Sequence, residues 1–406
     1  METKQLTKYV GAEKWPHPFY LFEFEQNVKR MAKLCSLNIQ PGDKTKRDFS
    51  LSFLNFKSLC MQKIIKQVCG IDVGQNELVV TIGRITDGLD VELYGRKTFA
   101  NIEKGFTTLL EWVKKLTDSS IETRYTMEAT GVYHEKLAYF LHGKQLPVSI
   151  VLPNKISNYF RTLEVKTVTD KTSSEVICRF GLERKLDGWK PAHPIYKNLR
   201  QLTRERDQLV QTRTVAKNQL HAEQSEAEPN KGTLTRIKKQ IALLDKQEKE
   251  IKAELAAIVK QHDTINKKVS LITSIPGVGL LTAVTVLAET NGFELIRNKK
   301  QLVSYAGLDV QEKQSGTSVK GKPRISKKGN KYLRKAMHLP ALSAIKNNEI
   351  HKAIFARLVS KHGIKMKAAV AVQRKLLEMI YIIFKTEKLY NKDYLQKIRE
   401  QLITTP

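Results

Sequence analysis

The sequence predicts an α/β domain, a long helical arm and an α-helical C-terminal domain, in that order. Strand-like and helix-like patterns alternate from residue 66 to about residue 184, which is typical of an α/β layer fold. A long polar stretch with helical spacing follows, and apolar helical periodicity returns after residue 268. The predicted parts are a poorly ordered N-terminal extension (1–62), the α/β domain (66–190), the arm (191–268), the C-terminal helical domain (269–390) and a tail (391–406).

Five stretches of the α/β domain have the short, β-branched character of strands. Three of them precede the first helix, as in an RNase H-like sheet. Apolar residues at helical spacing predict one helix through Phe106 and Val113 and a second helix over 133–141. The expected strands are 68–73, 78–82, 91–99, 125–128 and 148–152.

The chain carries far more positive charge than solubility requires. Its 406 residues include 70 Lys and Arg against 41 Asp and Glu, which gives a formal charge of +29. This excess favours a polyanionic partner, with nucleic acid as the first candidate and an anionic membrane surface as the second. No membrane-spanning segment is expected, because the longest uncharged apolar stretch, 279–288, has about half of the roughly 20 residues that a spanning helix needs.

The cysteines and the N-terminus favour a reducing, cytoplasmic compartment. The four cysteines are widely spaced and form no CxxC pair, so neither disulfides nor a zinc site is expected. They are Cys35, Cys60, Cys69 and Cys178. Residues 1–60 lack a secretory signal and sustained periodicity. Since Met61 directly precedes the first strand, we expect native translation to start there, which N-terminal mapping by mass spectrometry tests.

The arm is predicted to form two helices separated by a turn at residues 229–232. Apolar residues occur on both sides, and those after the turn follow the 3-4 spacing of a heptad with one polar gap at Glu248. An antiparallel hairpin or an intermolecular coiled coil is expected, and ordinary helix packing within one chain fits the pattern equally well. The apolar positions are Leu199, Leu202, Leu209, Leu234, Ile237, Ile241, Leu244, Ile251, Leu255 and Ile258.

The first candidate site residue is Asp72, in the Cys-Gly-Ile-Asp-Val-Gly sequence of residues 69–74. It lies where an apolar strand turns, between glycines that leave room for a metal ion or a phosphate. An acid in this place is a metal ligand in RNase H-like nucleases and part of the phosphate loop in actin-like ATPases and sugar kinases. An Asp beside Gly is also common in ordinary turns, so an ordinary turn remains an alternative for this motif.

A second acid, Glu128, ends a short strand in the sequence Met-Glu-Ala-Thr-Gly-Val-Tyr. A carboxylate at the end of a neighbouring strand can share a divalent ion with Asp72, because Mg²⁺ prefers a few carboxylates together with water and substrate phosphate. Glu128 can equally cap the helix that follows.

A third acid, Asp170, opens a helix in the sequence Thr-Asp-Lys-Thr-Ser-Ser-Glu. A metal ligand and a plain N-cap are both compatible with an Asp in this position. Ser173 follows three residues later on the same helical face, whereas Glu175 lies on another face.

A Pro-Gly turn and a basic segment mark the C-terminal domain. Gly277 and Gly279 fit a helix-hairpin-helix element, whose backbone N–H groups face a DNA phosphate, or a simple turn between helices. Nine basic residues and no acid occur from residue 313 to 335, so phosphate contact is expected. They are Lys313, Lys320, Lys322, Arg324, Lys327, Lys328, Lys331, Arg334 and Lys335. Ser315, in the same segment, is indistinguishable by its chemistry from an ordinary loop serine.

Taken together, the motifs resemble those of the insertion sequence 110 family of transposases. In order they are GIDVG, MEATGVY, TDK, IPGVG, SYAGLD, QSG and ISKKGNKYLRKA, from about residue 66 to residue 389. The resemblance implies a RuvC-like N-terminal domain with a DEDD carboxylate set and a C-terminal transposase domain. It also implies site-specific joining of element and target DNA, guided by a structured RNA transcribed from the ends of the element.

The resemblance assigns roles to individual residues. Asp72, Glu128 and Asp170 match the first three acids of the set and would bind Mg²⁺ or Mn²⁺. The serine of the family's QS-G motif falls on Ser315, which is expected to attack the DNA backbone and form a phosphoserine link. Because these residues are far apart along the chain, the resemblance implies a composite site between subunits of a dimer, or of a tetramer during synapsis, with the arm as the dimerising device.

The fourth acid of the family's set is missing from its usual position, which is Ser173 here. Either Glu175 rotates in to replace it, or Ser173 or a water molecule completes the metal shell.

Three other functions share part of this pattern. An actin-like ATPase or sugar kinase would need a second Gly-rich phosphate loop, and only helices are predicted after the α/β domain. A Holliday-junction nuclease would need neither Ser315 nor the long C-terminal third. A non-catalytic nucleic-acid-binding protein leaves the acids at the strand ends unexplained. The sequence therefore predicts a DNA recombinase of the cytoplasm, associated with the nucleoid.

Overall fold

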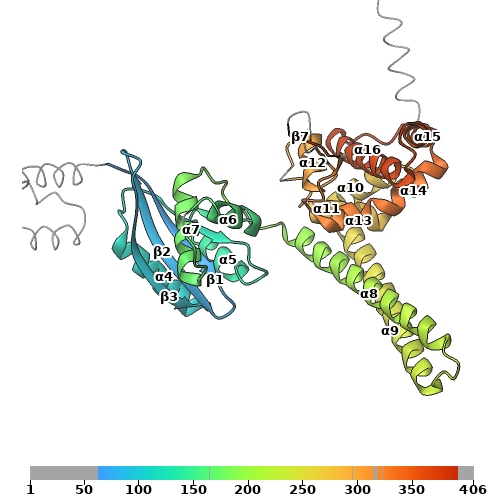
Figure 1. Cartoon of the computed structure of the whole chain (residues 1–406), viewed down its shortest axis with the longest axis horizontal. Coiled ribbons are helices and arrows are strands. Elements are labelled where there is room, and N and C mark those ends of the chain that lie inside the picture. The colour runs from blue at the N-terminus through green and yellow to red at the C-terminus, as the bar shows by residue number, and fades with distance from the viewer. Residues whose placement is uncertain are drawn as a thin grey trace, which may run out of the picture. The chain divides into compact units, whose positions relative to one another are not determined.

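The computed structural model of the chain describes residues 63–391, except residues 164, 295, 313, 316–318 and 322. The predicted extension (1–62) lies outside the described residues, and so does the predicted tail after residue 391. The chain divides into two compact units, Met1–Pro191 and Ala192–Pro406, each of which is described by itself (Figure 1).

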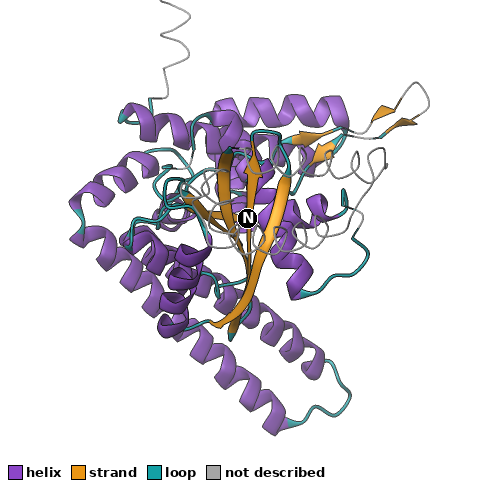
Figure 2. Cartoon of the chain, turned by 90° about the vertical axis from the view of Figure 1, so that its left-hand side faces the viewer, coloured by secondary structure: helices purple, strands orange, loops and turns teal. Residues whose placement is uncertain are grey.

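Unit 1 is built on one five-stranded mixed sheet (Figure 2). The strand order is β3-β2-β1-β4-β5, in which β1, β2 and β3 are antiparallel neighbours and β4 and β5 run parallel to β1. The strands are β1 (Ile64–Val73), β2 (Glu77–Thr86), β3 (Val91–Ala100), β4 (Thr123–Glu128) and β5 (Val148–Val151). All five predicted strands are present, and the α/β layer fold with an RNase H-like sheet is confirmed.

Helices cover both faces of this sheet. They are α4 (Glu103–Leu116), α5 (Glu135–Gly143), α6 (Pro153–Phe160) and α7 (Asp170–Glu183). Ile71 and Val73 of β1 share a core with Phe106 of α4 and Leu137 of α5. Because side chains alternate along a strand, the even-numbered residues of β1 face the other side, where α7 packs. The sequence did not predict α6, and the helix predicted over 133–141 begins two residues later.

Gly70 allows α7 to lie directly on β1. A Cβ atom at Gly70 would lie 2.4 Å from the backbone nitrogen of Cys178, and one at Gly181 would lie 2.7 Å from a methyl carbon of Val68. No side chain fits between these two backbones. Residue 70 lies against residue 178, and residue 68 lies against residue 181, so α7 runs antiparallel to β1. The N-terminus of α7 therefore lies at the carboxyl end of β1.

Unit 2 begins with two long antiparallel helices, α8 (Pro194–Gln224) and α9 (Lys231–Gln261) (Figure 1). The side chain of Asn230 accepts a hydrogen bond from the Thr233 amide (3.0 Å) and caps α9. Apolar residues of α9, including Leu244 and Ile251, are buried at the heptad positions.

The polar gap at Glu248 is filled by an ion-pair network. Glu248 is only 4% exposed and pairs with Arg206 and Arg213 of α8 and with Lys252 of its own helix. Burial alone would raise the pKa of this carboxyl, but the hydrogen bonds from Lys252, Arg206 and Arg213 outweigh it and lower the pKa to about 2. Glu248 is therefore charged at neutral pH, and its pairs with Arg206 and Arg213 join the two long helices.

The rest of unit 2 is a helical domain with one short ribbon. Its core joins Leu287 of α11, Leu302 of α12 and Leu376 of α16 to Leu199 and Leu255 at the base of the two long helices. The helices are α10 (Asp263–Thr273), α11 (Leu280–Glu289), α12 (Lys299–Tyr305), α13 (Lys331–Ala336), α14 (His338–Asn347), α15 (Glu349–His362) and α16 (Lys365–Thr386). The ribbon pairs β6 (Val310–Gln311) with β9 (Arg324–Ile325) and β7 (Gln314–Ser315) with β8 (Val319–Lys320). Among the described residues, no helix combines the length and apolar character needed to cross a membrane.

Candidate active site

Asp72 and Glu128 lie at the same edge of the sheet in unit 1. In the parallel pairing of β1 with β4, Gly70 is opposite Thr126 and Ile71 is opposite Met127. Asp72 and Glu128 are the next residues along the two strands, and both are partly buried. By the alternation of the strands, both side chains lie on the face that α7 covers. Two carboxylates thus meet at the carboxyl ends of neighbouring parallel strands.

Asp170 brings the third carboxylate to this edge. It is the first residue of α7 and is exposed. The N-cap is Thr169, whose hydroxyl accepts a hydrogen bond from the Thr172 amide, while the Thr172 hydroxyl accepts one from the Thr169 amide. The reading of Asp170 as a plain N-cap is therefore wrong. Since Thr169 satisfies the helix end, the Asp170 carboxylate is not needed for capping.

The three acids influence one another electrostatically. The pKa of Asp72 is raised to about 6, first by burial and then by the negative charges of Asp170 and Glu128. Burial also raises the pKa of Glu128, partly offset by a hydrogen bond from Thr130. No described Lys or Arg side chain forms an ion pair with any of the three acids. The site has a concentration of negative charge that no cation among the described residues neutralises.

This donor set has the chemistry that a hard divalent cation requires, namely carboxylate oxygens with uncompensated charge. In the described part of the chain, however, no three His, Cys, Asp or Glu side chains stand in a geometry that would hold a metal ion. The case for a metal ion at this site therefore rests on three features: the three residues are acids, they lie at the same edge of the sheet, and their negative charge is not compensated by described residues.

Ser173 and Glu175, the two candidates for the fourth position, differ in their surroundings. Ser173 is partly buried, and its amide continues the first turn of α7 by donating to the carbonyl of Thr169. Glu175 forms an ion pair with Arg96 of β3. The structure thus gives Glu175 a cationic partner of its own.

Asp72→Asn is expected to stabilise the metal-free protein at high pH. A carboxyl whose folded pKa is raised contributes stability below its unfolded pKa and loses it as the pH rises through the folded value. For Asp72 this window runs from the ordinary value of 3.8 to about 6. In urea unfolding with a chelator, the variant should exceed the wild type by about 1–3 kcal/mol at pH 8. The advantage should shrink towards pH 4, and an advantage independent of pH would contradict this origin.

Ser315 lies in unit 2, on β7, where its backbone pairs with Val319 of β8. Its side chain is exposed. Ser315 and the three carboxylates thus belong to different units of the chain.

The basic segment is only partly available for phosphate contact. Arg334 is partly buried and donates to the carbonyl of Ala306 (2.7 Å), and Lys335 forms an ion pair with Asp207 of α8. Four of the predicted residues are exposed and form no ion pair with a described residue, which leaves them for a polyanion. They are Arg324, Lys327, Lys328 and Lys331. Lys313 and Lys322 lie outside the described residues, and Lys320 is described only by its backbone in β8.

The two glycines before α11 have different environments. Gly277 has φ +90°, and a Cβ atom there would lie 3.0 Å from the carbonyl oxygen of Pro340 on α14. The positive φ and the close contact with α14 both require glycine at this turn between helices, so packing alone accounts for Gly277. Gly279 is the N-cap residue of α11 and has no atom within 4 Å of its Cβ position. Of the two glycines, only Gly279 has open space beside it, at the N-terminus of α11.

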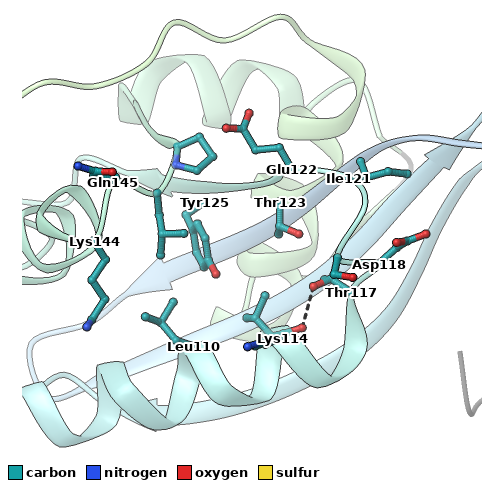
Figure 3. Close-up of a pocket in the computed structure, with 14 residues that line it drawn as sticks. Leu110, Lys114, Thr117, Asp118, Ile121, Glu122, Thr123, Tyr125, Lys144 and Gln145 are labelled. Atoms are coloured by element: carbon teal, nitrogen blue, oxygen red, sulfur yellow. Dashed lines mark hydrogen bonds between the residues drawn. The ribbon is translucent and has the colours of Figure 1, made fainter. Parts of the chain in front are cut away.

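A groove of about 510 Å³ lies at the opposite end of the unit 1 sheet (Figure 3). Lys114 and Thr117 line it from α4 and the residue that follows, Thr123 and Tyr125 line it from β4, and Gln145 lines it from the loop after α5. Because Thr123 is the first residue of β4 and Glu128 is the last, the groove is separate from the three acids.

The strand order and the acids at the strand ends define an RNase H-like domain of the DEDD nuclease and transposase class. Sequence profiles agree with this class. The profile described as "Transposase", of the IS110 DEDD type, matches residues 69–225, and the profile "Transposase IS116/IS110/IS902 family" matches residues 269–356. The chain belongs to the IS110 family of transposases, and it is a DNA transposase or recombinase.

Individual relatives extend over most of the chain. It is 28% identical over 300 residues to the pilin gene-inverting protein of Moraxella bovis, covering 73% of this chain and 90% of that protein. It is 23% identical over 297 residues to the transposase for insertion sequence element IS1111A of Coxiella burnetii, covering 65% and 78%. Among solved structures, T. thermophilus RuvC in complex with Holliday junction substrate is 11% identical, with a TM-score of 0.22 and coverage of 28% of this chain and 90% of that one. A TM-score this low does not support the assignment of the fold, which rests instead on the strand order of the sheet.

Proposed function

We propose that this transposase cuts and rejoins DNA at the ends of a mobile element and at its target through a two-part centre. One part is the acid cluster, defined as Asp72, Glu128 and Asp170, and the other is Ser315. The observation that carries the proposal is the meeting of three carboxylates from β1, β4 and α7 at one sheet edge, with no ion pair to a described Lys or Arg. Structural ion pairs would explain acids gathered in this way, but none of the three forms one with a described residue.

The acid cluster would hold Mg²⁺ or Mn²⁺, which supplies positive charge for the oxygens of the scissile phosphate. Asp72 has to be ionised to act as a ligand, so binding should strengthen as the pH rises through about 6. Glu128 and Asp170 approach the same edge from a neighbouring strand and a helix end. Ser173, or a water molecule beside it, would complete the shell, since Glu175 is paired with Arg96.

Ser315 would act as the nucleophile. Its Oγ forms a bond to the phosphorus, the bond from phosphorus to the departing deoxyribose oxygen breaks, the serine proton passes to water, and the departing oxygen takes up a proton. Attack by a deoxyribose hydroxyl on the phosphoserine reverses these changes and rejoins the strands without another energy source. The exposed position of Ser315 on a narrow ribbon suits access to a DNA backbone.

We further propose that the centre is completed between subunits, as a dimer that becomes a tetramer in synapsis, with the hairpin of α8 and α9 as the coiled-coil dimerising arm. The charge of +29 and the exposed basic residues around Lys328 support binding of DNA and of a guide RNA. The open N-terminus of α11 at Gly279 is a further phosphate-binding candidate. The name of the Moraxella bovis relative, which describes gene inversion, supports rearrangement of DNA as the outcome. A cytoplasmic location with association to the nucleoid follows from these partners.

The test of this proposal is trapping of a covalent protein–DNA adduct. Wild-type protein with Mg²⁺ and DNA carrying the element ends should form an adduct that resists detergent, whereas Ser315→Ala should form none. Ser304→Ala, another exposed serine of unit 2, is the matched control and should form the adduct normally. Persistence of the adduct in Ser315→Ala would place the nucleophile elsewhere, and Tyr332 is the next candidate.

A further inference from the structure

Glu289, the last residue of α11, is a buried carboxylate on which three elements meet. Its side chain is 1% exposed. It accepts two hydrogen bonds from the Arg204 guanidinium of α8, at 2.7 and 2.8 Å, and a third from the side-chain amide of Asn330, at 2.6 Å. The carboxylate is buried while the Arg204 side chain is 41% exposed, and a bidentate pair of this kind has a strict geometry. The base of the long hairpin and the start of α13 are therefore fixed to one carboxylate.

Asn330 uses both ends of its side-chain amide. The oxygen accepts from the backbone amides of Tyr332 (2.9 Å) and Leu333 (3.0 Å) and caps α13, while the nitrogen donates to Glu289. Its backbone amide donates to the carbonyl of Tyr305 (2.7 Å), and the Tyr305 hydroxyl donates to the carbonyl of Glu289 (3.0 Å). A displacement of Asn330 would strain or break several of these bonds at once.

The chain that leads into Asn330 lies against the turn after α12. Ser326 donates twice to Asp309, from its amide to the carbonyl (2.9 Å) and from its hydroxyl to the carboxylate (2.5 Å). The Lys327 amide donates to the carbonyl of Gly307 (3.1 Å). Gly307 has φ +65°, and a Cβ atom there would lie 3.0 Å from the carbonyl carbon of Lys327, so the two backbones touch directly. The segment from Ser326 to Asn330 is thus held along its whole length.

Ser315 belongs to the ribbon that grows out of this held segment. Directly before Ser326, Ile325 of β9 pairs with Val310 of β6 and packs against the apolar core of unit 2. Farther out on the same ribbon, β7 with Ser315 pairs with β8. The contacts of Ile325 and Ser326 therefore fix the base of this ribbon.

We infer that Glu289 is a positioning residue for Ser315, because through Arg204 and Asn330 it couples the base of α8 to the ribbon. The inference rests on the proposed role of Ser315 as the nucleophile. A buried ion pair adds little net stability over apolar packing, but it can fix one arrangement of the elements it joins. A nucleophile needs such fixing, since a misplacement of about 1 Å can cost on the order of 100-fold in rate.

The test compares two full-length variants that each neutralise one buried glutamate of unit 2. Glu289→Gln keeps the shape of the side chain but turns one of its acceptor oxygens into an NH₂ group, which then faces a donor of Arg204 or Asn330. Glu248→Gln is the matched control, because Glu248 is 4% exposed and paired with arginines, yet contacts neither Asn330 nor the ribbon. Three quantities are measured: the rate of adduct formation on DNA, the DNA affinity, and the hydrogen exchange of backbone amides in residues 310–325.

Glu289→Gln should slow adduct formation by about 10- to 100-fold and speed amide exchange in residues 310–325 by about 10-fold. DNA affinity should stay within about 3-fold, since the exposed basic residues are unchanged. Glu248→Gln should leave the amide exchange of residues 310–325 near the wild-type value, since Glu248 contacts only α8 and its own helix. If Glu289→Gln does not fold, Arg204→Lys, which keeps the charge but not the bidentate geometry, takes its place with the same expectations.

Equal acceleration of amide exchange in residues 310–325 in both variants would overturn the inference, because general destabilisation would then explain it. Unchanged exchange in residues 310–325 of Glu289→Gln would overturn it as well. If the wild type forms no adduct that depends on Ser315, the proposed nucleophile fails, and the exchange comparison still decides whether Glu289 holds the ribbon.

Discussion

Asp72→Asn is expected to lower metal-dependent DNA cleavage by at least about 100-fold. The substitution keeps the size of the side chain but removes the anionic oxygen that faces Glu128 and Asp170 at the sheet edge. Loss of folding cannot explain such a result, since the same variant is expected to be more stable than the wild type above pH 6. DNA affinity should change little, because the exposed basic segment lies in the other unit. Cleavage of labelled element ends at several Mg²⁺ concentrations measures the effect.

Glu175→Gln is the matched control for this experiment. It makes the same change from carboxylate to amide on α7, but at a residue that pairs with Arg96. Its cleavage rate should stay within about 3-fold of the wild type, as for an exposed ion pair of little energetic weight. A loss as large as that of Asp72→Asn would instead make Glu175 the fourth acid of the set. Wild-type cleavage by Asp72→Asn would remove the acid cluster from the proposed centre.

Metal binding can be measured apart from cleavage. Mn²⁺ or Mg²⁺ should raise the melting temperature of the wild type at pH 8, since a ligand that binds only the folded protein stabilises it. Asp72→Asn should show no such rise. A rise of equal size in both proteins would place the metal site elsewhere.

Gly70→Ala is expected to destabilise the protein by about 3 kcal/mol, near the upper end for an added methyl in a packed core. The new Cβ would lie 2.4 Å from the backbone nitrogen of Cys178, and backbone atoms cannot rotate away as a side chain can. Helix α7 would have to move off the sheet. Because Asp170 begins this helix, the shift should also weaken the stabilisation by Mn²⁺. Urea unfolding with and without metal measures both effects.

Gly143→Ala provides the control. Gly143 ends α5, and no atom lies within 4 Å of its Cβ position, so Ala should be neutral or up to about 1 kcal/mol more stable. If Gly70→Ala costs less than 1 kcal/mol, α7 can adapt to a side chain beneath it, and the close approach would not be required for the site.

Much of unit 1 was predictable because its signals are local. The alternation of apolar residues gives the five strands, and their order along the chain gives an RNase H-like sheet. The positions of Asp72 and Glu128 at strand ends follow from the same pattern. Helix α6 was missed because it is only eight residues long and begins at a proline directly after β5. Whether Asp170 caps α7 stays open from the sequence, since Thr and Asp are both good caps and only the observed bonds of Thr169 distinguish them.

The sequence by itself determined the strands, the acids at their ends, the heptad pattern of the arm and the excess of positive charge. Only the tertiary structure decided which of these residues meet. It placed α7 against Gly70, paired Glu175 with Arg96, filled the polar gap at Glu248 with arginines, and joined Glu289 to Arg204, a residue that the motifs did not mark. The physical reason is that periodicity and capping depend on neighbours along the chain. Ion pairs and close backbone contacts depend instead on residues that only the folded backbone brings together.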